Sequence, residues 1–462
     1  MPAERTSALD PATPRRVHVV GAGGAGMSAI ASVLAAMGHV VTGSDLKRSP
    51  VTERLEASGV RVSVGHDAAH VADAEILAVS TAVPDTNPEV AEGRRRGLVV
   101  LSRAEALAQI ARSRRCVAVS GTHGKTTTTS MLGLILIEAK MRPSFLIGGD
   151  VNEIGTNAVW DSGPWLVLEA DESDGTFLEL SPEIAVVTNV EPDHLDHYGS
   201  FEGLVDAFDR FVRSSPGGAV VGSDDPVAAR LGLDHGATLV GESAASAYRI
   251  VDLDLGPDGG VSFTLRHDDG ELGRVALPVT GANIARNAAV AVVTAMAMGA
   301  PFDAAARALA RFAGVARRFE SRGEAGGVRY VDDYAHLPGE VAAVIAAARA
   351  VGVLRVVVVF QPHRYSRIAA LGEEFADAFT GADVVVITDI FPAGEAPRPG
   401  VTGRVVADAV RRAHPGLDVT YVAGRAELRH HVAGVLVAGD LCLTLGAGDL
   451  TTLPDELQGA MA

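Results

Sequence analysis

The chain has 462 residues, of which 47% are hydrophobic and 21% are charged, and its formal net charge is −17. This length exceeds what one hydrophobic core can serve and predicts about three domains, and the composition is that of a soluble globular protein. The acidic balance argues against a general nucleic-acid binder, whose surface would be basic. Anionic substrates would therefore depend on local basic clusters and Mg²⁺.

The N-terminal segment lacks the apolar core of a secretion signal, and no later stretch of about 18 apolar residues predicts a membrane span. The two cysteines, Cys116 and Cys442, lie far apart in apolar runs. This usage is typical of buried thiols in a reducing compartment. We therefore expect a cytoplasmic protein that binds neither nucleic acid nor a membrane.

The first block, residues 1–112, alternates strands and helices from the apolar run VHVV onward. Directly after this run, a G-x-G-x-x-G turn is formed by Gly21, Gly23 and Gly26. Asp45 follows at the end of the next strand. The pattern is typical of a turn that holds a pyrophosphate at a helix N-terminus, and NAD, FAD or a nucleotide sugar would fit it.

Other polar residues of the first block suit a sugar or base ring. The segment STAVPDTNPEV follows a strand and supplies Ser80 and Asn87. His66 lies in a loop, where a solvated histidine is as good a reading as a ligand contact.

The second block, residues 113–319, opens with CVAVSGTHGKTTTT, in which an apolar strand enters a glycine loop before a helix. Glycines let the backbone approach phosphate, the lysine reaches the β- and γ-phosphates, and the following threonine can ligate Mg²⁺. Val119 stands where the general Walker A pattern has glycine, which leaves G-x-x-G-K-T. The pattern predicts an ATP site at Gly121, Thr122, His123, Gly124, Lys125, Thr126 and Thr127.

Two later strand ends of this block carry candidate metal ligands. Glu169 lies in LEADESDGTF, beside Asp171 and Glu172, and His194 lies in NVEPDHLDHYG. Carboxylate oxygens near a phosphate loop suit Mg²⁺, whereas the absence of a nearby cysteine and the spacing disfavour zinc. We predict Thr126, Glu169 and His194 as ligands of Mg²⁺, with Mn²⁺ as an alternative.

The third block, residues 320–462, has polar clusters after two strands. VDDYAHLPGE supplies Tyr334 and His336, and QPHRYSR supplies His363, Arg364 and Arg367. Guanidinium groups pair bidentately with carboxylates, so this cluster predicts a carboxylate-binding fork, the alternative being an exposed basic loop.

Together these motifs resemble those of the Mur ligase family: GAGGAGMS, TNPE, GTHGKTTTT, EADESD, NVEPDHLDHYG, RRFE, DDYAH, QPHRYSR and GAGD stand in the family's order. The resemblance implies an α/β fold with a Rossmann-like N-terminal domain for a UDP-sugar, a central P-loop ATPase-type domain with a parallel sheet, and a Rossmann-like C-terminal domain. It also implies an enzyme of peptidoglycan biosynthesis, a monomer or homodimer, that uses ATP to join L-alanine to UDP-N-acetylmuramate through an acyl phosphate.

The resemblance also assigns roles by position. Catalytic roles fall on Lys125, His194, Arg364 and Arg367. The UDP-sugar contacts fall on Gly21, Gly23, Gly24, Ala25, Gly26, Asp45, Ser80 and Asn87. Asn287 would contact adenine and Asp332 the ribose side of ATP. The incoming amino acid would be held by Tyr334, His336, His363, Arg364 and Arg367.

Two segments depart from the family pattern. Leu337 and Gly339 stand where the family has histidine and threonine, and Asn283 and Ile284 stand where it has histidine and asparagine. These changes leave open the adenine contacts and the choice among L-alanine, glycine and L-serine.

Two other functions are weighed against the ligase. An NAD-dependent oxidoreductase would explain the first glycine turn but not the phosphate loop or the acidic cluster. A nucleotide-binding regulator without turnover is opposed by the intact lysine, carboxylates and Arg/His cluster.

Overall fold

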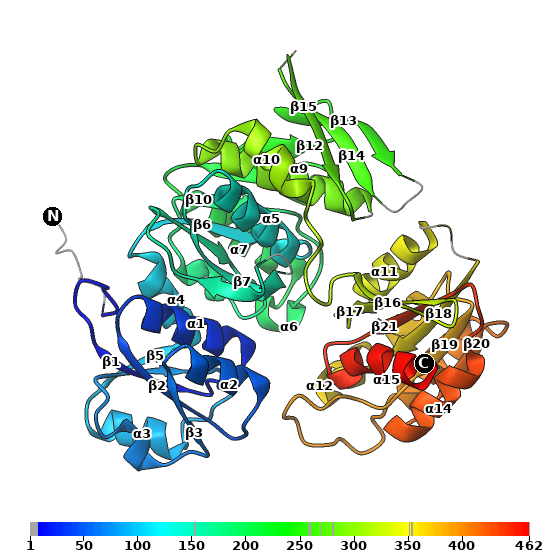
Figure 1. Cartoon of the computed structure of the whole chain (residues 1–462), viewed down its shortest axis with the longest axis horizontal. Helices are drawn as coiled ribbons and strands as arrows, with labels where there is room; N and C mark the ends of the chain where they lie inside the picture. The colour runs from blue at the N-terminus through cyan, green and yellow to red at the C-terminus, as the bar shows by residue number, and fades with distance from the viewer. Residues whose placement is uncertain are drawn as a thin grey trace. The chain divides into compact units, whose positions relative to one another are not determined.

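The computed structural model describes residues 8–151, 154–256, 260–268, 270–279, 281–350, 352 and 354–461. These residues form three sheets flanked by helices, so the predicted α/β class with three sheet-containing parts is confirmed (Figure 1). The chain divides into two compact units, Met1–Leu255 with Gly260–Ala313 and Gly314–Ala462 with Gly256–Gly259.

The N-terminal sheet has five parallel strands in the order β3-β2-β1-β4-β5. The strands are β1 (Arg16–Val20), β2 (Val40–Asp45), β3 (Arg61–Val64), β4 (Ile76–Val79) and β5 (Val99–Ser102). The helices are α1 (Ala25–Ala36), α2 (Pro50–Ala57), η1 (Ala68–Val71), α3 (Pro88–Arg95) and α4 (Arg103–Ala111). Strand β3 was not anticipated, because its four residues are only partly buried and form no apolar run.

The central sheet has ten strands in the order β15-β14-β13-β12-β11-β10-β6-β9-β7-β8. They are β6 (Arg115–Ser120), β7 (Ser144–Val151), β8 (Thr156–Val159), β9 (Trp165–Glu169), β10 (Ile184–Val187), β11 (Ala219–Gly222), β12 (Thr238–Gly241), β13 (Tyr248–Leu255), β14 (Val261–His267) and β15 (Gly270–Leu277). The prediction of a parallel sheet holds from β7 to β13, but β8, β14 and β15 pair antiparallel. These hairpins close both ends of a sheet whose middle carries the loops of the candidate site.

Helices α5 (Lys125–Glu138), η2 (Thr176–Glu179), α6 (Leu195–Tyr198), α7 (Phe201–Arg213), α8 (Pro226–Asp234), α9 (Ala282–Ala297) and α10 (Phe302–Leu309) accompany this sheet. Helix α5 is buried along most of its length despite its run of threonines. The hydroxyls of Thr129 and Ser130 donate to the carbonyls of Lys125 and Thr126, one turn earlier. These bonds satisfy polar groups that burial would otherwise penalise.

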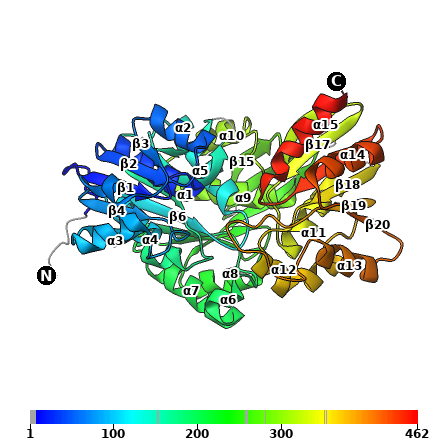
Figure 2. The same ribbon diagram turned by 90° about the horizontal axis from the view of Figure 1, so that it is seen from below.

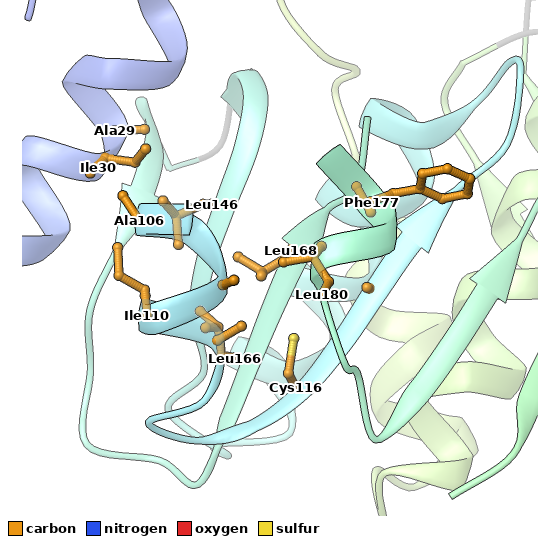
Figure 3. Packing of buried hydrophobic residues seen from close by; sticks show 14 of the residues in the cluster. Ala29, Ile30, Ala106, Ile110, Cys116, Leu146, Leu166, Leu168, Phe177 and Leu180 are labelled. Atoms are coloured by element: carbon orange, nitrogen blue, oxygen red, sulfur yellow. The ribbon is translucent and has the colours of Figure 1, made fainter. Parts of the chain in front are cut away.

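A shared hydrophobic core joins the N-terminal and central sheets within the first unit. Ile30 of α1 and Ile110 of α4 pack in one cluster with Leu146 of β7 and Leu168 of β9 (Figure 3). Burial of apolar side chains is the main stabilising term in such packing. The two sheets therefore belong to one compact unit, in which the glycine turn and the phosphate loop are both held.

The second unit contains a six-stranded sheet in the order β16-β17-β21-β18-β19-β20, parallel except for β16. Its strands are β16 (Glu320–Ala325), β17 (Val328–Asp333), β18 (Arg355–Phe360), β19 (Val384–Ile387), β20 (Asp418–Tyr421) and β21 (Asp440–Leu445). Its helices are α11 (Pro338–Ala350), α12 (Tyr365–Leu371), η3 (Gly372–Asp377), α13 (Arg404–Ala413), α14 (Arg425–Val435), η4 (Asp449–Thr452) and α15 (Leu453–Met461). Helices α11, α12 and α13 cover one face, and α14 and α15 cover the other (Figure 2).

Within the described ranges, no helix is long and apolar enough to cross a membrane. Cys116 and Cys442 are both unpaired and buried, and burial raises the pKa of each thiol to about 12.

Candidate active site

The glycine turn of the first block lies between β1 and α1 and is fastened to the end of β2. Gly21 adopts a φ of +80°, and the N–H groups of Gly21 and Ala22 both donate to the carbonyl of Ser44 at 2.9 Å. The N–H of Gly23 donates to Oδ2 of Asp45 at 2.8 Å, and a Cβ at Gly23 would lie 2.8 Å from the same oxygen. The structure thus brings Asp45 against the turn, and a side chain at Gly23 would have to displace the Asp45 carboxylate.

Other predicted UDP-sugar residues surround this turn. Gly24 is the N-cap of α1, and Ala25 is its first residue. A Cβ at Gly21 would lie 2.9 Å from the Cβ of Ser80, and a Cβ at Gly26 would lie 3.0 Å from Nη1 of Arg103. The glycines therefore allow Ser80 and Arg103 to approach the helix start.

Asn87 has a structural partner in the fold. Its Oδ1 accepts hydrogen bonds from the N–H groups of Glu89 at 2.9 Å and Val90 at 3.5 Å. Asn87 thereby caps α3, a common use of asparagine at a helix start. The predicted sugar contact of its side chain stays a prediction.

The phosphate loop lies between β6 and α5, as predicted from the sequence. Gly121 and Gly124 take φ values of +133° and +83°, which glycine adopts without a steric penalty. The N–H of His123 donates to Oδ1 of Asn189 at 2.8 Å, and the N–H of Glu191 donates to Oγ1 of Thr122 at 2.9 Å. The loop is thus held by the segment that follows β10, and Asn189 was missed from the sequence.

Lys125 is folded back onto the loop and pairs with a buried carboxylate. Its Nζ lies 2.6 Å from the carbonyl oxygen of Gly121 and 2.8 Å from Oε1 of Glu172. Burial opposes the charge of Lys125, but the carboxylates of Glu172, Asp171 and Glu169 outweigh it and raise the lysine pKa. Burial also disfavours the charged form of Glu172 and raises its pKa to about 7, although the attraction of Lys125 acts in the opposite direction. A cation is therefore held at the start of α5.

The predicted metal ligands gather around this pair. Oγ1 of Thr126 donates to Oε1 of Glu169 at 2.9 Å, and Nε2 of His194 lies 3.9 Å from Oε1 of Glu172. His194 adopts a φ of +52°, which is uncommon for a residue with a side chain. Oε2 of Glu172 is buried and has no hydrogen-bond partner in the part of the chain that the structure describes.

This donor set fits a hard divalent cation. The hydroxyl of Thr126 and the carboxylates of Glu169 and Glu172 are oxygen ligands of the kind that Mg²⁺ prefers. Among the described residues, nothing hydrogen-bonds to the buried Oε2 of Glu172. Over the described ranges, no group of three or more histidine, cysteine, aspartate or glutamate side chains is already arranged to hold a metal ion. Phosphate oxygens and water would have to supply the other ligands, as is usual for Mg²⁺.

Asn287 of α9 also lies at the phosphate loop. A Cβ at Gly124 would lie 2.6 Å from Oδ1 of Asn287 and 2.8 Å from its Nδ2. The amide of Asn287 is therefore packed against the turn that precedes Lys125. An adenine contact of Asn287 stays a prediction.

In the second unit, four of the predicted amino-acid-binding side chains form one cluster. The ring centroid of His336 lies 5.5 Å from that of Tyr334 and 5.6 Å from that of His363. Nη1 of Arg367 lies 3.0 Å from Nδ1 of His363. Residues from the ends of β17 and β18 thus meet, as expected for neighbouring loops at the carboxyl edge of a parallel sheet.

The charges of this cluster come from arginine. Burial, followed by the neighbouring His336, Arg367 and Arg364, lowers the pKa of His363 to about 3. Burial also lowers the pKa of His336. Both imidazoles are therefore neutral near pH 7. Arg364 has a φ of +65°, a strained conformation of the kind that gathers at binding sites.

Asp332, the predicted ribose contact, is almost wholly buried. Its Oδ1 accepts from Thr444 at 2.7 Å, and its Oδ2 accepts from Thr451 at 2.7 Å and from Arg317 at 3.3 Å. Its neighbour Asp333 accepts from the N–H of Phe319, and burial raises the pKa of Asp333 to about 6. These bonds give both aspartates a structural part in the loop that carries Tyr334, and the ribose contact stays a prediction.

Sequence models of the Mur ligase family match most of the chain. The match covers residues 16–115 with the "Mur ligase family, catalytic domain", 119–295 with the "Mur ligase middle domain", and 317–448 with the "Mur ligase, glutamate ligase domain". The chain belongs to the Mur ligase family. This membership favours the ligase over an NAD-dependent oxidoreductase.

Curated relatives cover nearly the whole chain. The UDP-N-acetylmuramate–L-alanine ligase of Geobacter sp. (strain M21) is 46% identical over 440 residues, which are 94% of this chain and 95% of the relative. The UDP-N-acetylmuramate–L-alanine ligase of Rubrobacter xylanophilus is 46% identical over 448 residues, which are 96% of this chain and 99% of the relative.

Solved structures share the fold over the same length. The UDP-N-acetylmuramate-alanine ligase of Thermotoga maritima superposes with a TM-score of 0.81 at 26% identity, covering 96% of this chain and 99% of that one. A murein peptide ligase of Psychrobacter arcticus gives a TM-score of 0.72 at 23% identity, covering 97% and 98%, which is a likeness of fold alone.

Proposed function

We propose that this chain is an ATP-dependent ligase that joins L-alanine to UDP-N-acetylmuramate in peptidoglycan biosynthesis. The observation that carries the proposal is a pair of contacts at the start of α5. Lys125 bonds to Glu172, in the loop after β9, and Thr126 bonds to Glu169, the last residue of β9. Family membership and the names of relatives at 46% identity supply the substrate class.

A carboxylate is a poor acylating agent, so the reaction needs an activated acid. The lactyl carboxylate of the sugar attacks the γ-phosphorus of ATP, ADP leaves, and an acyl phosphate forms. The neutral amine of L-alanine then attacks the acyl carbon and releases a proton. When the tetrahedral intermediate collapses, the carbon–oxygen bond to phosphate breaks and leaves the amide and inorganic phosphate.

Lys125 would act during the first transfer. Its Nζ now lies 2.8 Å from Glu172 and would turn toward the β- and γ-phosphates when ATP occupies the loop. There it would stabilise the charge that spreads over the equatorial phosphate oxygens. The Gly121–Gly124 turn would supply N–H groups at the start of α5.

Mg²⁺, or Mn²⁺ in its place, would be held by Thr126, Glu169 and His194, with the buried carboxylate of Glu172 beside them. Bound there, the ion would neutralise repulsion between the phosphate oxygens and the attacking carboxylate.

The amino acid would be held by the cluster in the second unit. Arg364 and Arg367 would pair with the carboxylate of L-alanine, because His336 and His363 are neutral near pH 7. The neutral imidazoles and Tyr334 would then orient the amine by hydrogen bonds. In the same proposal the domains are residues 1–112, 113–319 and 320–462, and a monomer or homodimer acts in the cytoplasm, where ATP is available.

The test is the release of phosphate from ATP by the purified chain. We expect release only when UDP-N-acetylmuramate and L-alanine are both present, with formation of the amide confirmed by mass spectrometry. Parallel reactions with glycine and L-serine compare the amino acids that Leu337 and Gly339 leave open.

The outcomes separate the proposal from its alternative. Tight ATP binding without phosphate release under any substrate combination would support a nucleotide-binding regulator. Release that depends on the sugar and on an amino acid other than alanine would keep the ligase and change its substrate.

A further inference from the structure

The carboxylate of Glu89, on α3, is buried and lies among polar side chains from several elements around the N-terminal sheet. The side chain of Glu89 is 0% exposed. Its Oε2 accepts from Oγ of Ser44 at 2.6 Å and lies 2.9 Å from Nδ1 of His66, and its Oε1 lies 2.7 Å from Nδ1 of His70. A buried charge persists only with partners of this kind.

His18 of β1 is the fourth neighbour of this carboxylate. Its Nε2 lies 3.7 Å from Oε1 of Glu89, and its Nδ1 lies 2.7 Å from Oγ1 of Thr42. Burial by itself would raise the pKa of Glu89, but the neighbouring His18, Ser44, His70 and His66 outweigh it and lower the pKa to about 2. The carboxylate is therefore ionised at neutral pH.

Ser44 connects this carboxylate to the glycine turn. The carbonyl oxygen of Ser44 accepts the N–H groups of Gly21 and Ala22, both at 2.9 Å. The next residue, Asp45, accepts the N–H of Gly23 at 2.8 Å. The hydroxyl of the same Ser44 donates a hydrogen bond to Glu89. The carboxylate therefore holds Ser44 in place, and Ser44 holds the glycine turn.

The same carboxylate orients two imidazoles at the edge of this region. His66 and His70 both direct Nδ1 toward Glu89, and their side chains are 12% and 25% exposed. A carboxylate that accepts a hydrogen bond from Nδ1 fixes the tautomer and leaves Nε2 as the acceptor. His66 is also 3.1 Å from Oγ of Ser44, so its ring contacts the end of β2 as well as Glu89.

We propose that Glu89 is a positioning residue for the sugar-nucleotide substrate: through Ser44 and His66 it holds the turn from Gly21 to Gly23 in the conformation that binds the diphosphate. The inference rests on the proposed function for the identity of the sugar nucleotide. Glu89 contacts no substrate itself. Its loss weakens binding of the sugar nucleotide and leaves the ATP loop unchanged, because that loop is held by Lys125 and the segment after β10.

The test compares Glu89→Gln with the wild-type protein. Glutamine keeps the size of the side chain but has one acceptor oxygen for several donors. We expect the Kd of UDP-N-acetylmuramate, measured by calorimetry, and its KM to rise about tenfold or more, by analogy with the loss of a hydrogen-bond partner behind a metal ligand. The KM values of ATP and L-alanine should change less than twofold.

Matched variants separate positioning from general destabilisation. His39→Asn alters another buried histidine of the same domain, whose Nδ1 accepts from the N–H of Arg15 at 3.0 Å, and should leave every KM unchanged. His66→Asn places an amide donor near the Nδ1 position and should retain more sugar affinity than His66→Gln. Melting temperatures of all variants are measured alongside.

Each outcome decides between the alternatives. A Glu89→Gln protein with wild-type sugar affinity, or one in which all three KM values rise together, would overturn the inference. A wild-type protein that binds the UDP-sugar without turnover would overturn the proposed function instead. If Glu89→Gln does not fold, Ser44→Ala tests the inference instead, because it removes only the hydroxyl that contacts Glu89. Ser44→Ala should raise the Kd of the UDP-sugar several-fold.

Discussion

The two glycine turns of the first unit share a plan but differ in what holds them. Each follows a buried strand and opens a helix, and each begins with a glycine at positive φ, Gly21 at +80° and Gly121 at +133°. The first turn is held by backbone bonds to Ser44 and by the carboxylate of Asp45. The second carries its own cation, Lys125, which folds back onto the loop and onto Glu172.

This difference separates binding from transfer. A turn that offers a ligand only backbone N–H groups suits a diphosphate that stays intact during the reaction. A turn that adds a fixed cation and a hydroxyl suits a phosphate whose charge changes during the reaction. If the two turns are independent, damage to one should leave binding at the other unchanged.

The largest effect is expected from Lys125→Ala. Loss of one preorganised charge at the transferring phosphate costs about 3–4 kcal/mol of transition-state stabilisation, or a fall in kcat of about 10²–10³. Steady-state phosphate release measures it, and Lys47→Ala, at an exposed lysine of the same unit, is the control. Near-normal turnover in Lys125→Ala would contradict the role of Lys125, and unchanged affinity for the UDP-sugar would support the separation of the two turns.

Acid should loosen the first turn through Glu89. Its pKa is lowered to about 2 in the fold, so the stabilisation it gives is present above its unfolded pKa and is lost as pH falls toward 2. The loss amounts to about 3 kcal/mol at most. Urea unfolding between pH 3 and 6 should show a shallower pH dependence in Glu89→Gln than in the wild-type protein.

The control for this prediction is Glu53→Gln, which removes an exposed carboxyl on α2 that lies 3.3 Å from the exposed Arg48. It should keep the wild-type pH dependence. A Glu89→Gln protein with the same slope as the wild-type protein would contradict the account of this buried cluster.

Loss of a metal ligand should affect the second turn and not the first. Glu169→Gln and Thr126→Val each remove an oxygen ligand at the second turn, and the Mg²⁺ concentration for half-maximal activity should rise about 10–100-fold. Affinity for the UDP-sugar without Mg²⁺ should not change. A wild-type Mg²⁺ dependence in both variants would exclude these residues as ligands.

The smallest effects are expected from adding one methyl group to each turn. A Cβ at Gly124 would meet Asn287 at 2.6 Å with φ at +83°, which costs about 1–2 kcal/mol and should raise the KM of ATP about tenfold. Gly23→Ala would instead meet Oδ2 of Asp45 at 2.8 Å and should raise the KM of the UDP-sugar. The assignment of the turns would be contradicted if Gly124→Ala raised the KM of the UDP-sugar or Gly23→Ala raised the KM of ATP.

The local features of the site were predictable because they depend on short stretches of sequence. Apolar runs that end in glycine predicted β1 with its turn and β6 with the phosphate loop. The same patterns placed Glu169 at the end of β9 and His363 after β18. Each of these features depends on period and turn chemistry, which neighbouring residues decide.

The missed features depend on contacts between distant segments. Glu89 reads as a helix residue in TNPEV, and only the fold brings Ser44, His66 and His70 to it. Nothing local indicates that Asn189 holds His123. Strand β20 is short and carries polar residues, so it lacks the apolar run of four or more residues found in β18 and β19.

The central claim is that the lactyl carboxylate is phosphorylated by ATP before alanine attacks. UDP-N-acetylmuramate labelled with ¹⁸O in both carboxylate oxygens tests it directly, because the oxygen that attacks phosphorus departs with the phosphate. The account predicts one ¹⁸O atom in each phosphate released. Unlabelled phosphate, formed alongside the amide product, would contradict it.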